Sequence, residues 1–292
     1  MRVMDPDLAE LLAGALRTVL YVGFVLLAGT LAFWTLVWPD GRYNRRQLLL
    51  VDAGLAILAV ATLLVPVVAV VTTGRAPLDA LSREGWVAVL LRLAVLVALW
   101  AFLSELVDAP IRGRRRLATG GAVVALTVTM VLGSDAVAVA PVWLSVVMSF
   151  AHLLAMATWL GGLLALAVVI RPRQQLTDLE ELIPALSRIS LVCIVTLVVT
   201  GAVQAVERTG GVSALASSTY GLVLLVKVAV FVGMLVLAVP VRRRTDAILL
   251  GRLDVEAPSA GTQTLALLMG AQLATAAALL VATAALVAVA PL

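Results

Sequence analysis

Apolar residues occur in eight long runs that are separated by short polar segments and continue to the last residue. The runs are continuous rather than alternating, and a helix needs about 20 apolar residues to cross the hydrocarbon core of a bilayer. Only helices or closed barrels satisfy their backbone groups there. The pattern therefore predicts an all-α polytopic membrane protein, a bundle of eight transmembrane helices. The expected spans are 14–38, 48–72, 86–107, 118–133, 142–170, 189–206, 219–240 and 264–290.

The composition supports this prediction and limits the possible functions. Of the 292 residues, 63% are hydrophobic and only 13% are charged. The widest gap between apolar runs, 241–263, is too short for a soluble catalytic domain, so we expect no enzyme activity. The first run exceeds the apolar core of about 7–15 residues in a signal peptide, and we expect it to be a retained span. We divide the bundle into two four-helix membrane halves, 1–140 and 141–292.

Basic residues are distributed unevenly between the two sides of the predicted bundle. The loops after the odd-numbered spans hold 14 arginines, whereas the opposite side holds five. By the positive-inside rule, the odd-numbered loops are cytoplasmic and the N- and C-termini are both outside. The net charge of +4 is explained by this topology. We therefore expect the lipid bilayer as a partner, and no nucleic acid.

The cytoplasmic segment 171–188 shows the sequence pattern of an amphipathic interfacial helix. Thr177 would be its N-cap, and Glu180, three residues later, would complete a capping box. A plain connector between two spans is an equally good interpretation.

The fifth run contains the only histidine of the chain, His152, with Met148 four residues before it and Met156 four residues after it. Residues four apart share a helix face. Thioether and imidazole ligands together suit Cu(I) better than a hard cation. The two methionines are about 12 Å apart along the axis, so the stripe predicts successive metal sites rather than one. Cys193 on the sixth run would lie near the depth of Met156. The alternative is a hydrogen-bonded histidine among packing methionines.

Further polar residues lie inside or near the outer ends of the runs. Arg92 is inside the third run and Lys227 inside the seventh, and each is expensive in a bilayer unless it reaches the interface. With Gln204 and Glu207 they could line a polar vestibule. Two cations near the path would oppose Cu(I) entry unless Glu207 or Asp135 neutralises them.

Three segments in the second half together resemble the copper resistance protein D (CopD) family of bacterial inner-membrane proteins. They are "HLLAMATWLGG" at 152–162, "SRISLVCIVTLVVTG" at 187–201 and "STYGLVLLVKVAVF" at 218–231. Their order and spacing match the family over about 141–244, whereas the first four runs match only as generic apolar helices. The residues that carry the resemblance are His152, Trp159, Gly161, Gly162, Thr200, Gly201, Tyr220, Gly221 and Lys227.

The resemblance implies eight spans, a CopD-like second half and copper handling in the bacterial cytoplasmic (inner) membrane, with inward transport. It also implies a secreted, CopC-like copper-binding β-sandwich protein as a possible partner. One departure is "PVRRR" at 240–244, where the family often has an Asn-Arg pair. The sequence has no Met-rich or His-rich outer tail, which favours delivery of copper by such a partner.

Three functions are therefore open. The first is copper uptake as Cu(I) through a Met/His site on the fifth helix. The second is an anion or proton-coupled carrier that uses Arg92, Lys227 and His152. The third is a non-transporting partner in copper supply to a membrane oxidase. The expected metal ligands are His152, Met148, Met156 and Cys193, and the expected residues of the path or vestibule are Arg92, Asp135, Trp159, Gln204, Glu207, Tyr220 and Lys227.

Overall fold

The computed structural model describes residues 6–105, 112–134, 136, 139, 141–169, 176–209, 221, 222 and 224–236. All regular elements in these residues are helical, and no strand occurs among them. The labelled elements are α1 (Pro6–Leu36), η1 (Pro39–Tyr43), α2 (Arg45–Thr73), α3 (Arg83–Glu105), α4 (Arg114–Leu132), α5 (Val142–Val169) and α6 (Leu176–Thr209). A shorter apolar helix covers Leu224–Val236, here called the 224–236 helix.

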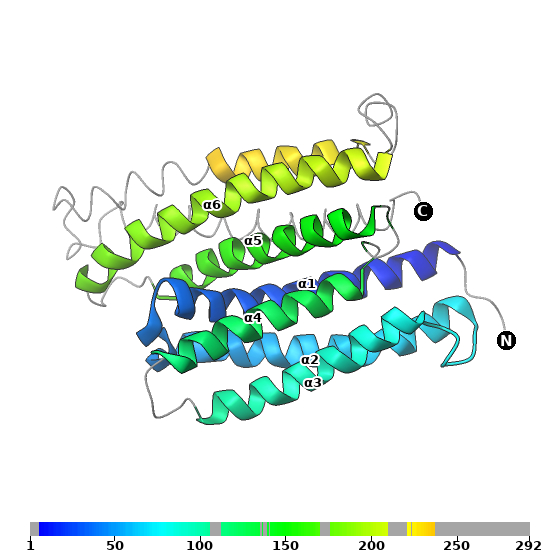
Figure 1. The fold of residues 1–292 in the computed structure, drawn as a ribbon, viewed down its shortest axis with the longest axis horizontal. Helices are drawn as coiled ribbons and strands as arrows, with labels where there is room; N and C mark the ends of the chain where they lie inside the picture. The colour runs from blue at the N-terminus through cyan, green and yellow to red at the C-terminus, as the bar shows by residue number, and fades with distance from the viewer. Residues whose placement is uncertain are drawn as a thin grey trace.

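The first six predicted spans are confirmed. The helices α1 to α6 each contain a stretch long and apolar enough to cross a membrane. The chain is thus a multi-pass membrane protein (Figure 1). The seventh predicted span corresponds to the 224–236 helix, and the eighth, at 264–290, lies outside the described residues.

Two helices begin at least eight residues before their predicted spans. The helix α1 begins eight residues earlier, at Pro6. The helix α6 begins at Leu176 and continues through the whole predicted span. A separate interfacial helix capped by Thr177 is therefore wrong, because Thr177 lies inside a helix of 34 residues. At 1.5 Å per residue α6 measures about 51 Å, more than the hydrocarbon core requires.

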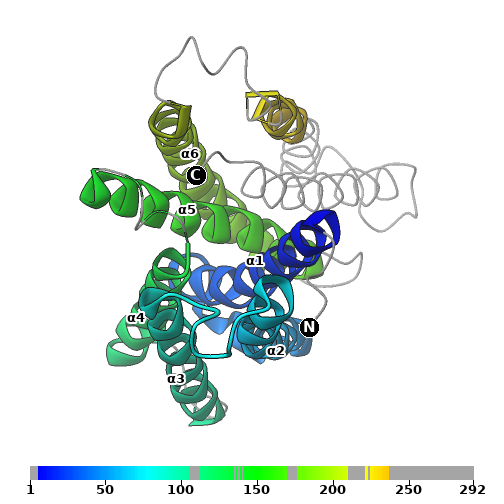
Figure 2. The same cartoon turned by 90° about the vertical axis from the view of Figure 1, so that its right-hand side faces the viewer.

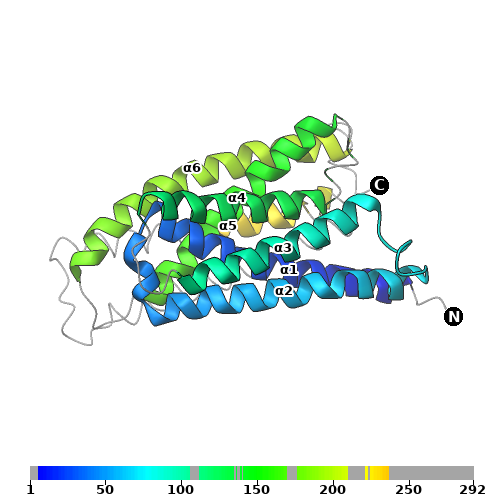
Figure 3. The same cartoon turned by 60° about the horizontal axis from the view of Figure 1, so that its bottom comes forward.

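The helix α1 lies at the centre of the described bundle. It packs against α2, α4 and α5, and the end-on view shows it between α2 and α5 (Figure 2). Its side chains Phe24, Leu27, Ala28 and Leu31 are fully buried. The helix α3 packs against α2 and α4, as Figure 3 also shows, and α6 packs against α5.

Glycines let α1 approach both of its main neighbours closely. At the crossing with α5, a Cβ atom on Gly161 would lie 2.3 Å from the Cα atom of Gly29. At the crossing with α2, a Cβ atom on Gly54 would lie 2.5 Å from the backbone nitrogen of Leu27. Gly161 thereby brings α5 into direct backbone contact with α1. Such contacts suit a membrane interior, where helices associate by packing rather than by the hydrophobic effect.

A polar contact set joins α1, α2 and α5 near the predicted cytoplasmic end. Gln47 of α2 is completely buried, and its Oε1 accepts a hydrogen bond from Trp34 Nε1 of α1. Its Nε2 donates to the backbone oxygen of Ala165 on α5, 3.3 Å away. The neighbouring Arg46 donates to the backbone oxygen of Val168 at 3.4 Å. Because these donors and acceptors satisfy one another, the first two helices are fixed against the fifth.

The outward faces of the peripheral helices are apolar. Large exposed apolar side chains include Leu63 on α2, Leu90 and Trp100 on α3, and Val195 and Val198 on α6. Exposed apolar surface over several helices is expected where the surrounding solvent is lipid.

Candidate functional site

The imidazole of His152 points toward α6. The residue lies ten positions after the start of α5, which is about 15 Å along the axis. Its Nδ1 atom is 2.8 Å from the hydroxyl oxygen of Thr200. A Cβ atom on the next residue, Gly201, would lie 3.6 Å from His152 Cε1. The Thr-Gly pair of α6 thus supplies both a hydrogen-bond partner and room for the ring.

The hydroxyl of Thr200 decides which nitrogen of His152 carries the proton. Its oxygen is 2.6 Å from the backbone oxygen of Thr196, and two oxygens at that separation require a hydrogen between them. The carbonyl has none, so Thr200 donates to Thr196 and can only accept from His152 Nδ1–H. In the neutral imidazole, this hydrogen-bond network assigns the proton to Nδ1 and leaves the lone pair on Nε2.

Polar residues follow one face of α6 on both sides of Thr200. Cys193 is seven positions before it, and Gln204 and Glu207 are four and seven positions after it, spacings that keep all of them on one face. Cys193 is a buried free thiol. Gln204 Nε2 and Glu207 Oε1 are buried without a hydrogen-bond partner in the described structure. Buried polar atoms of this kind call for a water, an ion or a ligand.

The 224–236 helix provides the third side of the site. Phe231 contacts Trp159 of α5 edge-on, with ring centroids 5.5 Å apart and an interplanar angle of 66°. Lys227 lies one turn before Phe231, and its charge acts on His152. The 224–236 helix thus packs against α5 at this aromatic pair. The site is therefore formed by α5, α6 and the 224–236 helix.

The predicted sulfur ligands have different environments. Met156 is 4% exposed and belongs to the same buried core cluster as Cys193 and Trp159, whereas Met148 is partly buried. Within the described ranges, no three His, Cys, Asp or Glu side chains gather as a metal-binding group. A closed site of three or four such ligands is therefore absent from that part of the chain.

Arg92 lies elsewhere, among the helices of the first half. Its Nη2 donates to the backbone oxygen of Thr129 on α4 at 2.7 Å, and its Nε donates to the Thr129 hydroxyl at 3.3 Å. Its other neighbours include Gly133 and Tyr21. These neighbours lie on α1 or on α4 and its C-terminal end, not on the three helices that form the His152 site. The predicted vestibule is thus divided between two places, and Asp135 and Tyr220 lie outside the described residues.

Residues 180–286 match the family model of copper resistance protein D. The match covers 107 of the 292 residues, and this part of the chain, here called the CopD region, is similar to that family. The CopD region contains Thr200, Gln204, Glu207 and Lys227, while His152 precedes it. It begins later than the expected 141–244 and continues into the last predicted span. No curated protein and no solved structure matches the chain.

Sequence reasoning missed two residues that position the predicted polar groups. Thr196, whose carbonyl fixes the hydroxyl of Thr200 in the CopD region, was not considered, although its spacing of four residues was a usable signal. Thr129, the partner of Arg92, gave no such signal because it is 37 residues away in the chain.

Proposed function

We propose that this protein transports copper across the bacterial cytoplasmic membrane, with His152 as the central ligand. The observation that carries the proposal is the hydrogen-bond chain from His152 through Thr200 to Thr196. A histidine that donates its other ring N–H to a fixed acceptor has a set tautomer and ring orientation, as metal-binding histidines usually have. Copper is the cargo of this site rather than a resident cofactor, and we propose transport rather than catalysis.

The oxidation state we propose is Cu(I). The candidate ligands beside the imidazole are soft thioethers and a thiol, at Met148, Met156 and Cys193, and such ligands select Cu(I). A cargo ion must also leave its site, so binding has to be weak or divided over several steps. The positive charge of Lys227 near His152 acts in this direction, because it opposes a resident cation.

The polar face of α6 supplies the proposed path. Along the helix, Glu207 and Cys193 are each about 10.5 Å from Thr200, on opposite sides of it. Copper would enter beside Glu207, whose carboxylate attracts a cation, pass Gln204 and reach His152. It would then continue toward Met156 and Cys193. A secreted CopC-like copper-binding protein is our proposed donor at the outer end.

The test is copper accumulation in cells that express wild-type protein or the His152→Ala variant at equal membrane levels. We expect accumulation to fall to that of cells without the protein. Thr158→Ala is the matched control, because Thr158 is also a buried polar residue of α5 but six positions on, at a different angle around the helix. Unchanged accumulation in His152→Ala would contradict the proposal.

The same experiment separates the two other candidate functions when it includes Lys227→Ala and purified protein in liposomes. An anion or proton-coupled carrier predicts loss of transport in Lys227→Ala with unchanged copper content. A copper-supply partner of a membrane oxidase predicts liposomes that move no copper and a protein that co-purifies with the oxidase.

A further inference from the structure

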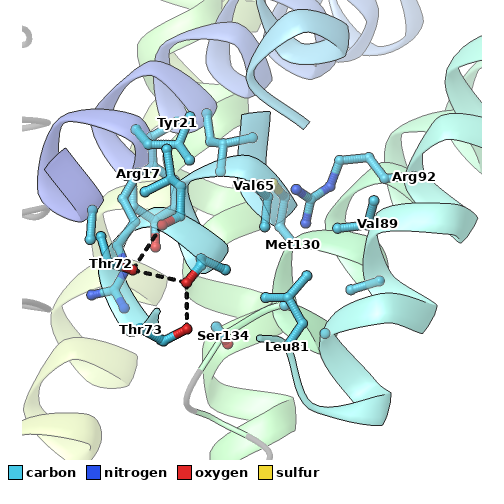
Figure 4. Close-up of a pocket in the computed structure, with 18 residues that line it drawn as sticks. Arg17, Tyr21, Val65, Thr72, Thr73, Leu81, Val89, Arg92, Met130 and Ser134 are labelled. Atoms are coloured by element: carbon cyan, nitrogen blue, oxygen red, sulfur yellow. Dashed lines mark hydrogen bonds between the residues drawn. The ribbon is translucent and has the colours of Figure 1, made fainter. Parts of the chain in front are cut away.

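The first half contains a cavity of about 280 Å³ that does not involve the His152 site. It lies where the end of α2, the start of α3 and the end of α4 meet α1, which is the predicted outer end of the bundle. Figure 4 shows Arg17 and Tyr21 on one side of it and Arg92 on the other. Its polar lining residues are Arg17, Tyr21, Thr72, Thr73, Arg92 and Ser134.

The charge of this cavity is unbalanced. Two guanidinium groups line it, and among the described residues of the lining none is acidic. Arg92 is only 4% exposed, and its bonds to Thr129 use two of its five N–H groups. Arg17 makes no hydrogen bond or ion pair in the described parts of the chain. Glu84, next to the lining residue Gly85, has an exposed side chain. Since an uncompensated buried charge is costly, the cavity calls for an anion.

Three hydroxyl groups of the cavity are already engaged as donors within their own helical turns. Thr72, Thr73 and Ser134 donate to backbone oxygens of their own helical turns at 2.8, 2.7 and 2.7 Å. The arginines therefore provide the available charged N–H groups.

The remaining wall is apolar, and includes Leu20, Val65, Val89 and Met130. A ligand that matches this lining has an anionic head and an apolar body.

We propose that the cavity binds a phosphate-type oxyanion that carries an apolar chain, with Arg17 and Arg92 as its cationic ligands. The planar guanidinium fork matches the oxygens of a phosphate group. The same chemistry is offered by the headgroup of an anionic membrane phospholipid and by a free alkyl phosphate. This binding is separate from the proposed copper transport, because the two sites share no residue.

The test measures the melting temperature of the full-length protein in nanodiscs. One set of discs contains phosphatidylcholine only, and a second contains added phosphatidylglycerol. Octyl phosphate and inorganic phosphate are titrated into the first set. A ligand at ten times its Kd should raise Tm by about 3 °C. A rise with phosphatidylglycerol alone identifies a bilayer lipid as the ligand, and a rise with octyl phosphate identifies a free amphiphile.

Three variants make the result specific to the cavity. Arg17→Gln removes one charge at a partly buried position, and we expect at least about tenfold weaker binding. Ala69→Leu fills the cavity without changing its charge and should also abolish the rise. Arg75→Gln is the matched control, since Arg75 is exposed in the loop after α2 and does not line the cavity; it should retain the full rise.

Two outcomes would overturn the proposal. The first is no rise in Tm with any of the three compounds. The second is an equal rise in wild type, Arg17→Gln and Ala69→Leu. If inorganic phosphate raises Tm as much as octyl phosphate does, the cavity binds an oxyanion, and the proposal that its ligand carries an apolar chain is wrong. Arg92→Gln is not a suitable test variant, because it would also remove the hydrogen bonds that join α3 to α4.

Discussion

His152 and Arg92 both lie inside apolar helices, and each is held by a threonine of a neighbouring helix. Thr200 donates its own hydrogen to the backbone of α6, and Thr129 donates to the oxygen of Leu126 in α4 at 2.7 Å. In both places the hydroxyl oxygen is left to accept a hydrogen bond from the nitrogen of the partner.

The two places differ in the hydrogen-bonding groups that each side chain has left after its bond to the threonine. His152 is left with a lone pair on Nε2, which suits a cation. Arg92 is left with unused N–H groups and a permanent charge, which suit an anion. One device, a threonine bonded to its own helix, therefore prepares two sites of opposite ligand charge in one membrane protein. The side chain that it holds sets the sign of the ligand.

The largest effect is expected at the crossing that joins the two regions. Gly161→Leu would place a side chain where a Cβ atom is already 2.3 Å from Gly29. Because both partners are backbone atoms, the helices must separate, and we expect a loss of about 3 kcal/mol or more in stability. Copper accumulation and the oxyanion-induced rise in Tm should both disappear. Thermal unfolding of the detergent-purified protein measures the effect.

The control for this crossing is Gly121→Leu. Gly121 lies on α4, and nothing would lie within 4 Å of an added Cβ atom. It should retain near wild-type stability, and equal losses in both variants would show that the α1–α5 crossing has no special importance.

The second prediction concerns the threonine of the His152 site. Thr200→Val keeps the shape of the side chain but removes the acceptor for His152 Nδ1–H. Loss of such a supporting contact typically costs 10- to 100-fold in metal affinity. We expect Cu(I) affinity, measured by competition with a colorimetric chelator, to fall by a factor in that range. Thr200→Ser should restore most of it, and equal affinity in Thr200→Val would remove Thr200 from the mechanism.

Much of the fold followed from apolar run length alone, because a bilayer imposes one length and one kind of element. Six spans were correctly placed. The α1–α5 crossing was not predictable, since the sequence does not tell which helix Gly161 meets. The extension of α6 to Leu176 was missed, because the polar residues before the apolar run have the composition of a loop between two spans.

The site was only partly predictable, for a similar reason. The expense of a polar group in lipid singles out His152 and Arg92, but their partners depend on which helices become neighbours. The vestibule expected around Arg92 and Lys227 assumed that both helices face one path. Arg17 was used only as one of the five arginines on the predicted outer side. Its position within the first apolar run was a signal that its side chain is partly buried in the bundle.

The third prediction concerns the entry to the proposed copper path. Glu207→Gln removes the carboxylate but keeps the size of the side chain. A charge about 10 Å from the His152 level changes the local cation concentration moderately, so half-maximal copper uptake should require about two- to tenfold more copper. Glu84→Gln is the control, because Glu84 is an exposed carboxylate in the other region. An unchanged copper dependence in Glu207→Gln would exclude this entry route.

The smallest effects are expected when a variant of one site is tested for the function of the other site. Mutations at sites that share no partners usually act independently, within a factor of about two. Arg17→Gln should therefore leave copper accumulation within about twofold of wild type, and His152→Ala should leave the rise in Tm with octyl phosphate or phosphatidylglycerol unchanged. Copper uptake and Tm, measured for both variants, check both expectations. If either variant abolished the function of the other region, the two sites would be coupled through the α1–α5 crossing. The oxyanion would then regulate copper transport instead of binding beside it.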